Sequence, residues 1–290
     1  MLVTDEALEA YYEVRARAQR RCETSESPAE ASRADALRDE IGSRGEDLYW
    51  ERLGDLNGLT IGEVGVGNGD FVRHALKQNA RTLVLIDLSR DRLDKVAQEF
   101  GLRSNGRETK IIVANAQRME GVDDGELDML AAKEIIEHLT DYRPFLKECH
   151  RVLRPGGRLY LTTPNRHCID LWPRGVLARI APPPKRQGPA LIREVFGHLF
   201  EYLTSQEVDL LAELLPPGFK EHIHEFAPGE LVRALKAYGF QTLRLWGTPP
   251  QIFYHELRPV ARQLFPAWSR ADRLSYALGD NLRVIAMRTE

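Results

Sequence analysis

The sequence contains little cysteine. Its three cysteines, Cys22, Cys149 and Cys168, are far apart, and none belongs to a Cys-x-x-Cys pair. An odd number at such spacings argues against the disulfide framework of small secreted proteins and against a cysteine-based zinc site. The pattern is typical of buried or incidental thiols in a reducing compartment, so we expect a cytoplasmic protein without a bound metal.

Long apolar runs and an excess of one charge are also absent. No run approaches the roughly 18 apolar residues of a membrane-spanning helix. Asp5, Glu6 and Glu9 lie where a secretory leader would have its apolar core. The formal net charge is −3 over 290 residues, so bulk charge favours neither a nucleic acid nor an anionic membrane as a partner.

From residue 59 onward, short apolar runs alternate with amphipathic segments of helical period. This alternation is typical of βαβ units, which build a parallel sheet. The predicted strands are 59–64, 82–87, 110–114, 127–132, 158–163, 240–246 and 281–288. The clearest helices are 89–100, 141–153 and 228–238, and the second should stop at Arg154-Pro155-Gly156-Gly157, a strong helix terminator.

These elements divide the chain into four predicted parts. An N-terminal helical extension, in which a polar loop at 23–30 separates two helical stretches, precedes the sheet core. An irregular, partly helical insertion, expected to pack over the strand ends, follows the fifth strand, and the last part completes the sheet around a second excursion at 247–280. The four parts are residues 1–57, 58–165, 166–226 and 227–290.

A glycine-rich segment directly follows the first predicted strand. Gly65, Gly67 and Gly69 can adopt backbone angles that other residues avoid, and they let a ligand approach the chain closely. Open α/β sheets bind ligands in loops at the carboxyl ends of their strands. A simple tight turn would use the same residues, so the segment alone is a weak signal.

Asp87 ends the second predicted strand. An acid at this position can accept both hydroxyls of an adenosine ribose, although it could also serve as a helix N-terminal charge before Ser89. Together with the glycines it also fits a nicotinamide-dependent oxidoreductase, which is the main alternative. That class requires Gly-x-Gly-x-x-Gly, yet position 70 is Asp70 and the third glycine is Gly69, so the spacing argues against it.

Five ordered motifs resemble those of class I S-adenosylmethionine-dependent methyltransferases, in the branch of the ubiquinone/menaquinone-type and other small-molecule enzymes. The resemblance covers residues 59–165 strongly. It implies an α/β fold: a Rossmann-like, seven-stranded, mostly parallel sheet with helices on both faces. The motifs are Glu63-Val-Gly65-Val-Gly67-Asn-Gly69, Ile86-Asp87-Leu88-Ser89, Val113-Ala114-Asn115-Ala116, Glu134-Ile-Ile-Glu137-His138-Leu139 and Leu153-Arg-Pro155-Gly156-Gly157.

The same resemblance implies S-adenosyl-L-methionine as the cofactor and assigns residues to its parts. Glu63 and the loop of Gly65, Gly67 and Gly69 would hold the methionine end, and Lys133 and Glu134 would line the methionine and methyl region. Asp87 would bind the ribose hydroxyls, with Leu88 against the adenine. Asn115, beside Ala116, would contact the adenine amino group; many relatives carry aspartate there, but an amide oxygen can also accept this hydrogen bond.

The sequence says less about the methyl acceptor and the base that would act on it. A hydroxyl acceptor usually needs a base, and histidine suits neutral pH. His138 is nearest the expected cofactor, and His198 lies in the insertion at 166–226, which we expect to enclose and choose the acceptor. These two histidines are therefore the catalytic candidates, although each could be merely structural. The further histidines His167, His222 and His224, a basic set (Arg174, Arg179, Lys185, Arg186, Arg193) and an aromatic set (Trp172, Phe196, Phe200, Tyr202) could equally be surface or packing residues.

The sequence therefore predicts a methyltransferase that acts on a small molecule, with oxygen the favoured acceptor atom and nitrogen or carbon as alternatives. In-line transfer of an activated methyl group depends on positioning and needs no metal. A nucleic-acid enzyme is disfavoured because Lys133-Glu134-Ile135-Ile136 stands where adenine-amino methyltransferases carry Asn-Pro-Pro-Tyr. A cofactor-binding protein without catalytic activity remains a third alternative.

Overall fold

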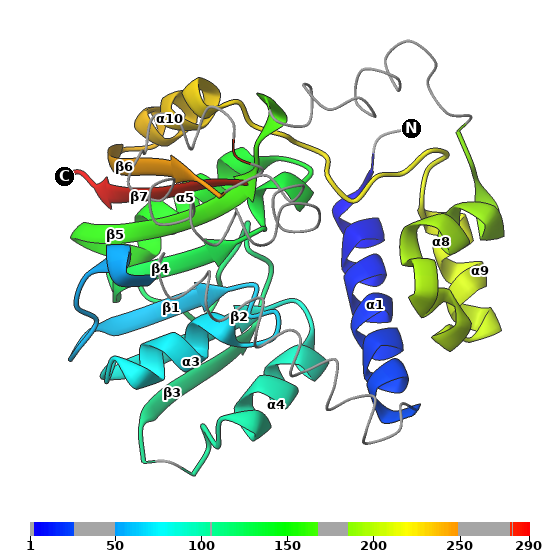
Figure 1. Ribbon diagram of the computed structural model, residues 1–290, viewed down its shortest axis with the longest axis horizontal. Coiled ribbons are helices and arrows are strands. Elements are labelled where there is room, and N and C mark those ends of the chain that lie inside the picture. The colour runs from blue at the N-terminus through cyan, green and yellow to red at the C-terminus, as the bar shows by residue number, and fades with distance from the viewer. Residues whose placement is uncertain (1–2, 26–49, 105, 168–184, 249–278, 280) are drawn as a thin grey trace, which may run out of the picture.

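The computed structural model describes residues 3–25, 50–104, 106–167, 185–248, 279 and 281–290. Its centre is a seven-stranded sheet of order β3-β2-β1-β4-β5-β7-β6 (Figure 1). The strands are β1 (Thr60–Val64), β2 (Thr82–Asp87), β3 (Glu108–Val113), β4 (Leu127–Lys133), β5 (Leu153–Pro164), β6 (Phe240–Gly247) and β7 (Asn281–Arg288). Neighbours among β1 to β5 are parallel, whereas β7 is antiparallel to β5 and β6. The predicted fold class is confirmed.

The sheet topology determines where a ligand can bind. β1 lies between β2 and β4, and every residue of β1 and β2 is buried, as parallel strands covered on both faces require. From β1 the strand order runs outward in both directions, to β2 and β3 on one side and to β4 and β5 on the other. Such a switch point leaves a crevice at the carboxyl ends of the strands.

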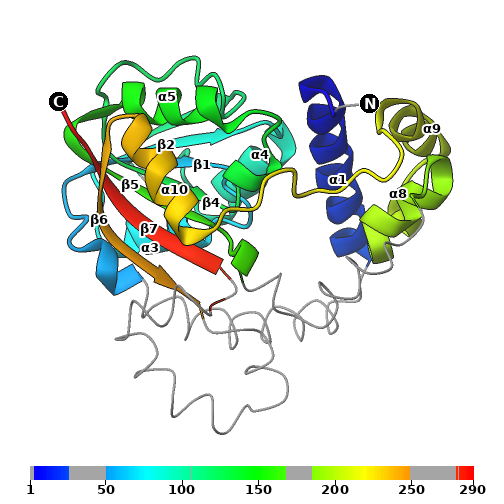
Figure 2. The same cartoon turned by 90° about the horizontal axis from the view of Figure 1, so that it is seen from above.

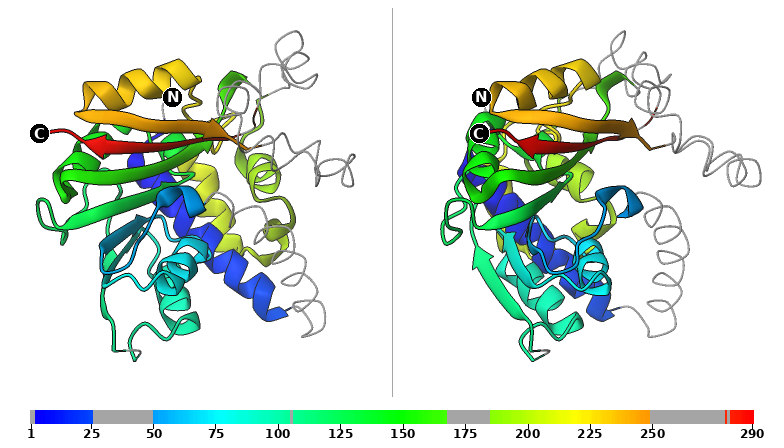
Figure 3. Two further views of the ribbon diagram at one scale, coloured as in Figure 1. Left: turned by 60° about the vertical axis from the view of Figure 1, so that its left-hand side comes forward. Right: turned by 90° about the vertical axis from the view of Figure 1, so that its left-hand side faces the viewer.

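Helices cover both faces of the sheet. One face packs against α3 (Asp70–Lys77) and α4 (Arg90–Glu99), and the other packs against α5 (Tyr142–Val152) and α10 (Pro228–Ala237). α10 lies along β6 at the edge of the sheet where the chain ends (Figure 3). The Ser89 and Asp141 side chains accept hydrogen bonds from backbone N–H groups in the first turns of α4 and α5, which sets where these helices begin.

Two predicted boundaries were wrong by three residues or more. α5 ends at Val152, but the proline- and glycine-containing segment after it belongs to β5, which begins at Leu153 rather than at residue 158. Leu153 already pairs with Leu127, and a register irregularity accommodates the extra residues before Arg158 pairs with Met129. At the N-terminus, the predicted loop at 23–30 starts too early, because α1 (Asp5–Ser25) runs three residues into it.

A second group of helices stands beside the sheet. α8 (Gly188–Phe196), η3 (Gly197–Tyr202) and α9 (Ser205–Leu214) share an apolar cluster with α1 that is separate from the two sheet clusters. α1 stands between the sheet and α8 and α9 (Figures 1 and 2). These helices of the insertion therefore pack against α1, whereas the sequence predicted that they would pack over the strand ends.

Some predicted features lie outside the described residues. They are most of the second helical stretch of the N-terminal extension, predicted at about 31–53, residues 168–184 of the insertion and most of the excursion at 247–280. Among the helices that the structure does describe, none combines the length and apolar character that crossing a membrane requires.

Candidate functional site

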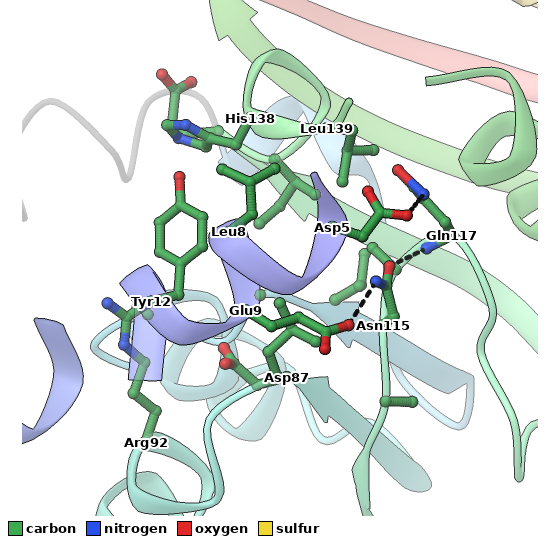
Figure 4. Close-up of a pocket in the computed structure, with 18 of the residues that line it drawn as sticks. Asp5, Leu8, Glu9, Tyr12, Asp87, Arg92, Asn115, Gln117, His138 and Leu139 are labelled. Carbon is green, nitrogen blue, oxygen red and sulfur yellow. Dashed lines mark hydrogen bonds between the residues drawn. The ribbon is translucent and has the colours of Figure 1, made fainter. Parts of the chain in front are cut away.

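A cavity of about 260 Å³ lies at the carboxyl ends of β1, β2 and β4, and α1 forms its outer wall (Figure 4). The sheet and its loops supply most of the residues that the sequence predicted for the cofactor. The predicted residues that line the cavity are Gly65, Gly67, Asp87, Leu88, Asn115, Ala116, Lys133, Glu134 and His138. Residues from four separate segments, which follow β1, β2, β3 and β4, thus meet at one edge of the sheet.

The glycine loop after β1 has two glycines on the cavity, each constrained differently. Gly65 has φ +74°, and a Cβ there would lie 2.1 Å from Cδ1 of Ile135, so only glycine fits. Gly67 has φ +51°, and a Cβ added there would have no atom within 4 Å, so the loop leaves open space in front of it. That open space is where a ligand can approach the backbone.

Asp87 connects this loop to the end of β2. Its Oδ2 accepts a hydrogen bond from the backbone N–H of Val66 at 3.0 Å, and its Oδ1 accepts one from the backbone N–H of Ser89 at 2.8 Å. Burial raises the pKa of Asp87, although Arg92 and these two N–H groups oppose the shift. The carboxyl group therefore shapes the loop and also borders the cavity.

Asn115 follows β3 at one end of the cavity. Its Oδ1 accepts a hydrogen bond from the backbone N–H of Gln117 at 2.8 Å, and its Nδ2 donates to Oε1 of Glu9 in α1 at 3.0 Å. Leu88 and Ala116 lie on the cavity beside it. This end combines apolar side chains with a polar edge, as a flat heterocyclic base would require.

Lys133 is the last residue of β4, and Glu134 follows it. β4 lies on the other side of β1 from β2, the strand that ends at Asp87. Glu134 has φ +51°, unusual for a residue other than glycine. Its backbone N–H donates to the carbonyl oxygen and to the hydroxyl of Thr162, and its Oε1 accepts a hydrogen bond from that hydroxyl at 2.6 Å. Thr162 therefore holds Glu134 in this conformation, while Nζ of Lys133 lies 4.9 Å from the ring centre of Trp50.

His138, in the short helix η2 (Ile136–His138), reaches the same cavity. Its Nδ1 lies 2.9 Å from the carbonyl oxygen of Glu221, an acceptor only, so Nδ1 carries the proton and donates it. Nε2 lies 3.7 Å from Oε1 of Glu137, beyond hydrogen-bond length. Burial lowers the pKa of His138, although the bond to Glu221 opposes the shift, so the neutral imidazole is favoured.

Sequence reasoning missed the outer wall of the cavity. Five residues of α1 line it, and so does Glu221 of the insertion, whose carboxylate lies 3.3 Å from Arg15 of α1. The helical period of residues 5–25 predicted a helix, but no local signal showed which surface that helix covers. The missed cavity residues of α1 are Asp5, Leu8, Glu9, Tyr12 and Arg15.

Three predicted site residues do not line the cavity. Glu63 is buried inside β1, between Leu85 and Ala131 of the adjacent strands. Gly69 precedes α3, and a Cβ there would meet Phe100 of the α4 segment, so this glycine serves helix packing. His198 is exposed in η3.

None of the remaining candidate residues that the structure describes lines the cavity either. His222 packs edge-on against His138 with ring centres 5.1 Å apart, whereas His224 contacts Tyr142 and His167 is exposed. Lys185, Arg186 and Arg193 are exposed, and the aromatic residues Phe196, Phe200 and Tyr202 pack in the cluster of α1. Trp172, Arg174 and Arg179 lie outside the described residues.

Glu137, His138 and His222 each offer a ligand atom, and these atoms lie within 4.8 Å of one another. Glu137 is fully buried, Oε2 accepts a hydrogen bond from the Thr163 hydroxyl, and burial with the nearby Glu134 raises its pKa. A raised pKa favours the protonated carboxyl group, which is a poor metal ligand. That the reaction needs no metal stays a prediction of the sequence.

The cavity fits S-adenosylmethionine in its main chemical requirements. The open backbone at Gly67 suits close approach of a ligand, the Asp87 carboxyl group suits a pair of hydroxyls, and the end near Leu88 and Asn115 suits a purine. The region of Lys133, Glu134 and His138 would then adjoin the methionine and methyl end.

Comparisons with known proteins agree with this assignment. Residues 62–161 match the methyltransferase domain family. The chain is 24% identical to the ubiquinone biosynthesis O-methyltransferase of Leptothrix cholodnii over 78% of this chain and 79% of that protein. It is 31% identical to the enzyme of the same name from Xanthomonas oryzae pv. oryzae over 39% of this chain and 46% of that protein.

A solved structure shows the same fold. The S-adenosylmethionine-dependent methyltransferase from Mesorhizobium loti superposes with a TM-score of 0.52 at 18% identity, over 84% of this chain and 98% of that one. These findings favour a methyl donor over the nicotinamide cofactor of the alternative. Domain match, fold and cavity together identify the chain as an S-adenosylmethionine-dependent methyltransferase, a member of the class I superfamily.

Proposed function

We propose that this protein transfers a methyl group from S-adenosylmethionine to a hydroxyl oxygen of a small-molecule acceptor, with His138 as the base. The observation that carries the proposal is the orientation of His138 on the cavity. Because Nδ1 donates to the carbonyl oxygen of Glu221, the lone pair of the neutral ring is on Nε2. A base in this state can accept the proton that an acceptor hydroxyl loses.

The cofactor would occupy the part of the cavity that the sheet forms. Asp87 would bind the ribose, Leu88, Asn115 and Ala116 the base, and the loop of Gly65 and Gly67 the methionine part. When bound, the cofactor supplies an activated sulfonium methyl group. The chain contributes orientation and exclusion of water, which α1 provides by covering the cavity.

The acceptor would enter on the side of His138. Tyr12, Arg15 and Glu221 border the cavity there, and the Tyr12 hydroxyl is buried without a hydrogen-bond partner among the described residues. A hydroxyl acceptor could satisfy this phenol while its proton passes to His138. The predicted role of segment 166–226 in choosing the acceptor gains support from Glu221, which belongs to it.

The names of the relatives support oxygen as the acceptor atom, since both compared relatives are O-methyltransferases. An amine acceptor would need little help from a base, and a carbon acceptor would need an activated carbon. Neither alternative explains a partly buried histidine held in one tautomer on the cavity.

The test is methyl transfer from isotopically labelled S-adenosylmethionine by the purified chain. The acceptor panel contains catechols and hydroxylated quinol precursors, each paired with an amine analogue, and products are read by mass and fragmentation. Label on the oxygen of a hydroxyl acceptor supports the proposal. Transfer only to amines or to carbon would overturn it.

The same assay separates catalysis from binding alone. A cofactor-binding protein without activity would bind S-adenosylhomocysteine but transfer label to no acceptor in the panel or in a metabolite extract. The cytoplasmic location and the absence of a nucleic-acid partner stay predictions of the sequence.

A further inference from the structure

Glu9 holds an unusual position for a residue of the N-terminal helix, because it lies on the cavity at the end formed by β3. Its carboxylate faces Asn115 in Figure 4, and its Oε1 accepts the hydrogen bond from Asn115 Nδ2 at 3.0 Å. This contact joins residues 106 positions apart in the chain. Two segments that lie far apart in the sequence therefore form the polar edge at this end of the cavity.

The local hydrogen bonds determine what Asn115 can offer a ligand. Its Oδ1 accepts from the backbone N–H of Gln117 at 2.8 Å, and because that backbone group is a donor only, the amide orientation is settled: Nδ2 points toward Glu9. The oxygen of Asn115 is thus already engaged, while the amide has a second N–H. The strong acceptor at this edge is the carboxylate of Glu9.

This pattern complements the amino edge of adenine. The exocyclic 6-amino group donates hydrogen bonds, and the ring nitrogen beside it accepts one. A carboxylate next to an amide N–H matches that pair, while Leu88 and Ala116 offer apolar surface for the faces of the ring. A purine with an oxygen at position 6 would instead place an acceptor against the carboxylate, which is repulsive.

We propose that Glu9 binds the 6-amino group of the cofactor's adenine, with Asn115 positioning its carboxylate. The inference rests on the proposed placement of the cofactor in this cavity. It makes the N-terminal helix part of the purine recognition site, because the main acceptor for the amino group comes from α1 and not from the sheet.

The experiment is titration calorimetry of the full chain with S-adenosylhomocysteine and with S-inosylhomocysteine, its 6-oxo counterpart. We expect the wild-type protein to prefer the 6-amino ligand by about tenfold, since the 6-oxo ligand loses a hydrogen bond to a charged acceptor and places its own oxygen against that carboxylate. Glu9→Gln replaces a carboxylate oxygen with an amide that can donate to the 6-oxo group. The preference should then fall to within about threefold.

Two further variants separate this role from a general effect on folding. Glu6→Gln changes an exposed acid of the same helix away from the cavity and should keep the wild-type preference. Adding Asn115→Asp to Glu9→Gln returns a carboxylate to the same edge and should restore the preference. Melting temperatures of all variants are measured alongside.

The outcomes are distinct. An unchanged preference in Glu9→Gln, or equal loss in Glu6→Gln, would overturn the role of Glu9 while leaving the cofactor site intact. If the wild-type chain bound neither ligand, the cofactor placement itself would fail, and this inference with it.

Discussion

The carboxyl group of Asp87 accepts a hydrogen bond from the backbone N–H of Val66 at 3.0 Å, and this bond joins the end of β2 to the glycine loop after β1. Ser89 N–H donates to the other oxygen of the same carboxyl group at 2.8 Å. One side chain therefore sets the shape of the loop, the start of α4 and the floor of the cavity. A change at Asp87 should affect all three.

Asp87→Ala should weaken binding of S-adenosylhomocysteine by more than tenfold, about 1.4 kcal/mol or more. It removes the proposed acceptor for the ribose hydroxyls and leaves the buried backbone N–H groups of Val66 and Ser89 without their partner. Calorimetry at constant pH measures the loss. Asp70→Ala is the control, because Asp70 is an exposed acid outside the cavity whose partner is Arg73. Wild-type affinity in Asp87→Ala would remove the ribose assignment.

Gly67→Ala and Gly58→Ala should differ in ligand binding but resemble one another in stability. Both glycines have positive φ, and a Cβ added at either would have no atom within 4 Å, so each alanine costs about 1 kcal/mol of backbone strain. Only Gly67 lines the cavity. Thermal unfolding should shift equally in both variants, whereas affinity for S-adenosylhomocysteine should fall only in Gly67→Ala. Equal affinities would show that the open space at Gly67 is not used.

His138→Ala should lower kcat by about a hundredfold while changing cofactor affinity less than threefold, because general-base catalysis contributes roughly that much. His198→Ala should leave both unchanged, since His198 is exposed and is not among the residues that line the cavity. Once an acceptor is known, steady-state kinetics give the comparison. A similar loss in both variants would return His138 to a structural role.

The pH profile offers a second test of His138. Burial lowers its pKa below the usual 6.5, and the groups facing it are Glu221, His222, Arg15, Glu137 and Tyr12. The neutral, basic form is therefore present at lower pH than for an exposed histidine. The rate should rise through an apparent pKa below 6.5 and be flat from pH 7 to 8. A rise centred above pH 7 would point to another base.

Glu207 should stabilise the docking of α1 in a pH-dependent way. Burial opposes its ionisation, but the Thr204 N–H and the guanidinium groups of Arg17 and Arg21 outweigh this and lower its pKa. The stabilisation is complete above about pH 4.5 and is lost as the pH falls through the lowered value. Glu207→Gln should cost about 1 kcal/mol at pH 7, with a smaller difference near pH 3 in denaturant melts. A constant difference would contradict this.

A chelator should leave methyl transfer unchanged. Glu137, the fully buried member of the three grouped ligand-type residues, has a raised pKa and favours its protonated form. Dialysis against EDTA, followed by assay with and without added Mg²⁺ or Zn²⁺, checks this. Activity that disappears and returns with one cation would instead assign a metal to Glu137, His138 and His222.

The sheet part of the site could be predicted because short motifs at the strand ends specify its residues. Gly65, Asp87, Asn115 and Lys133 each lie at or just beyond the end of a predicted strand, and parallel strands bring such positions to one edge. The strand itself provides the placement, so a motif a few residues long is sufficient. The order of the motifs also predicted the methyl donor, which the comparisons then supported.

The other half of the site had no such signal. An amphipathic helix shows that residues 5–25 have an apolar face, but it does not show which surface that face covers. Glu9, Tyr12 and Glu221 reach the cavity only because α1 packs between the sheet and the insertion helices. His198 failed to reach it for the same reason.

Strand ends and glycine turns thus follow from short-range backbone geometry. The order of the motifs, with the family resemblance that they carry, was enough to predict the sheet, most of the residues that line the cavity at its strand ends, and the class of reaction. The outer wall of the cavity, which α1 forms, depends on long-range packing. Its position is set by the shape and burial of apolar faces on segments that are more than a hundred residues apart in the chain. Only the tertiary structure showed that the N-terminal helix, and Glu9 with it, faces Asn115 at the β3 end of the cavity.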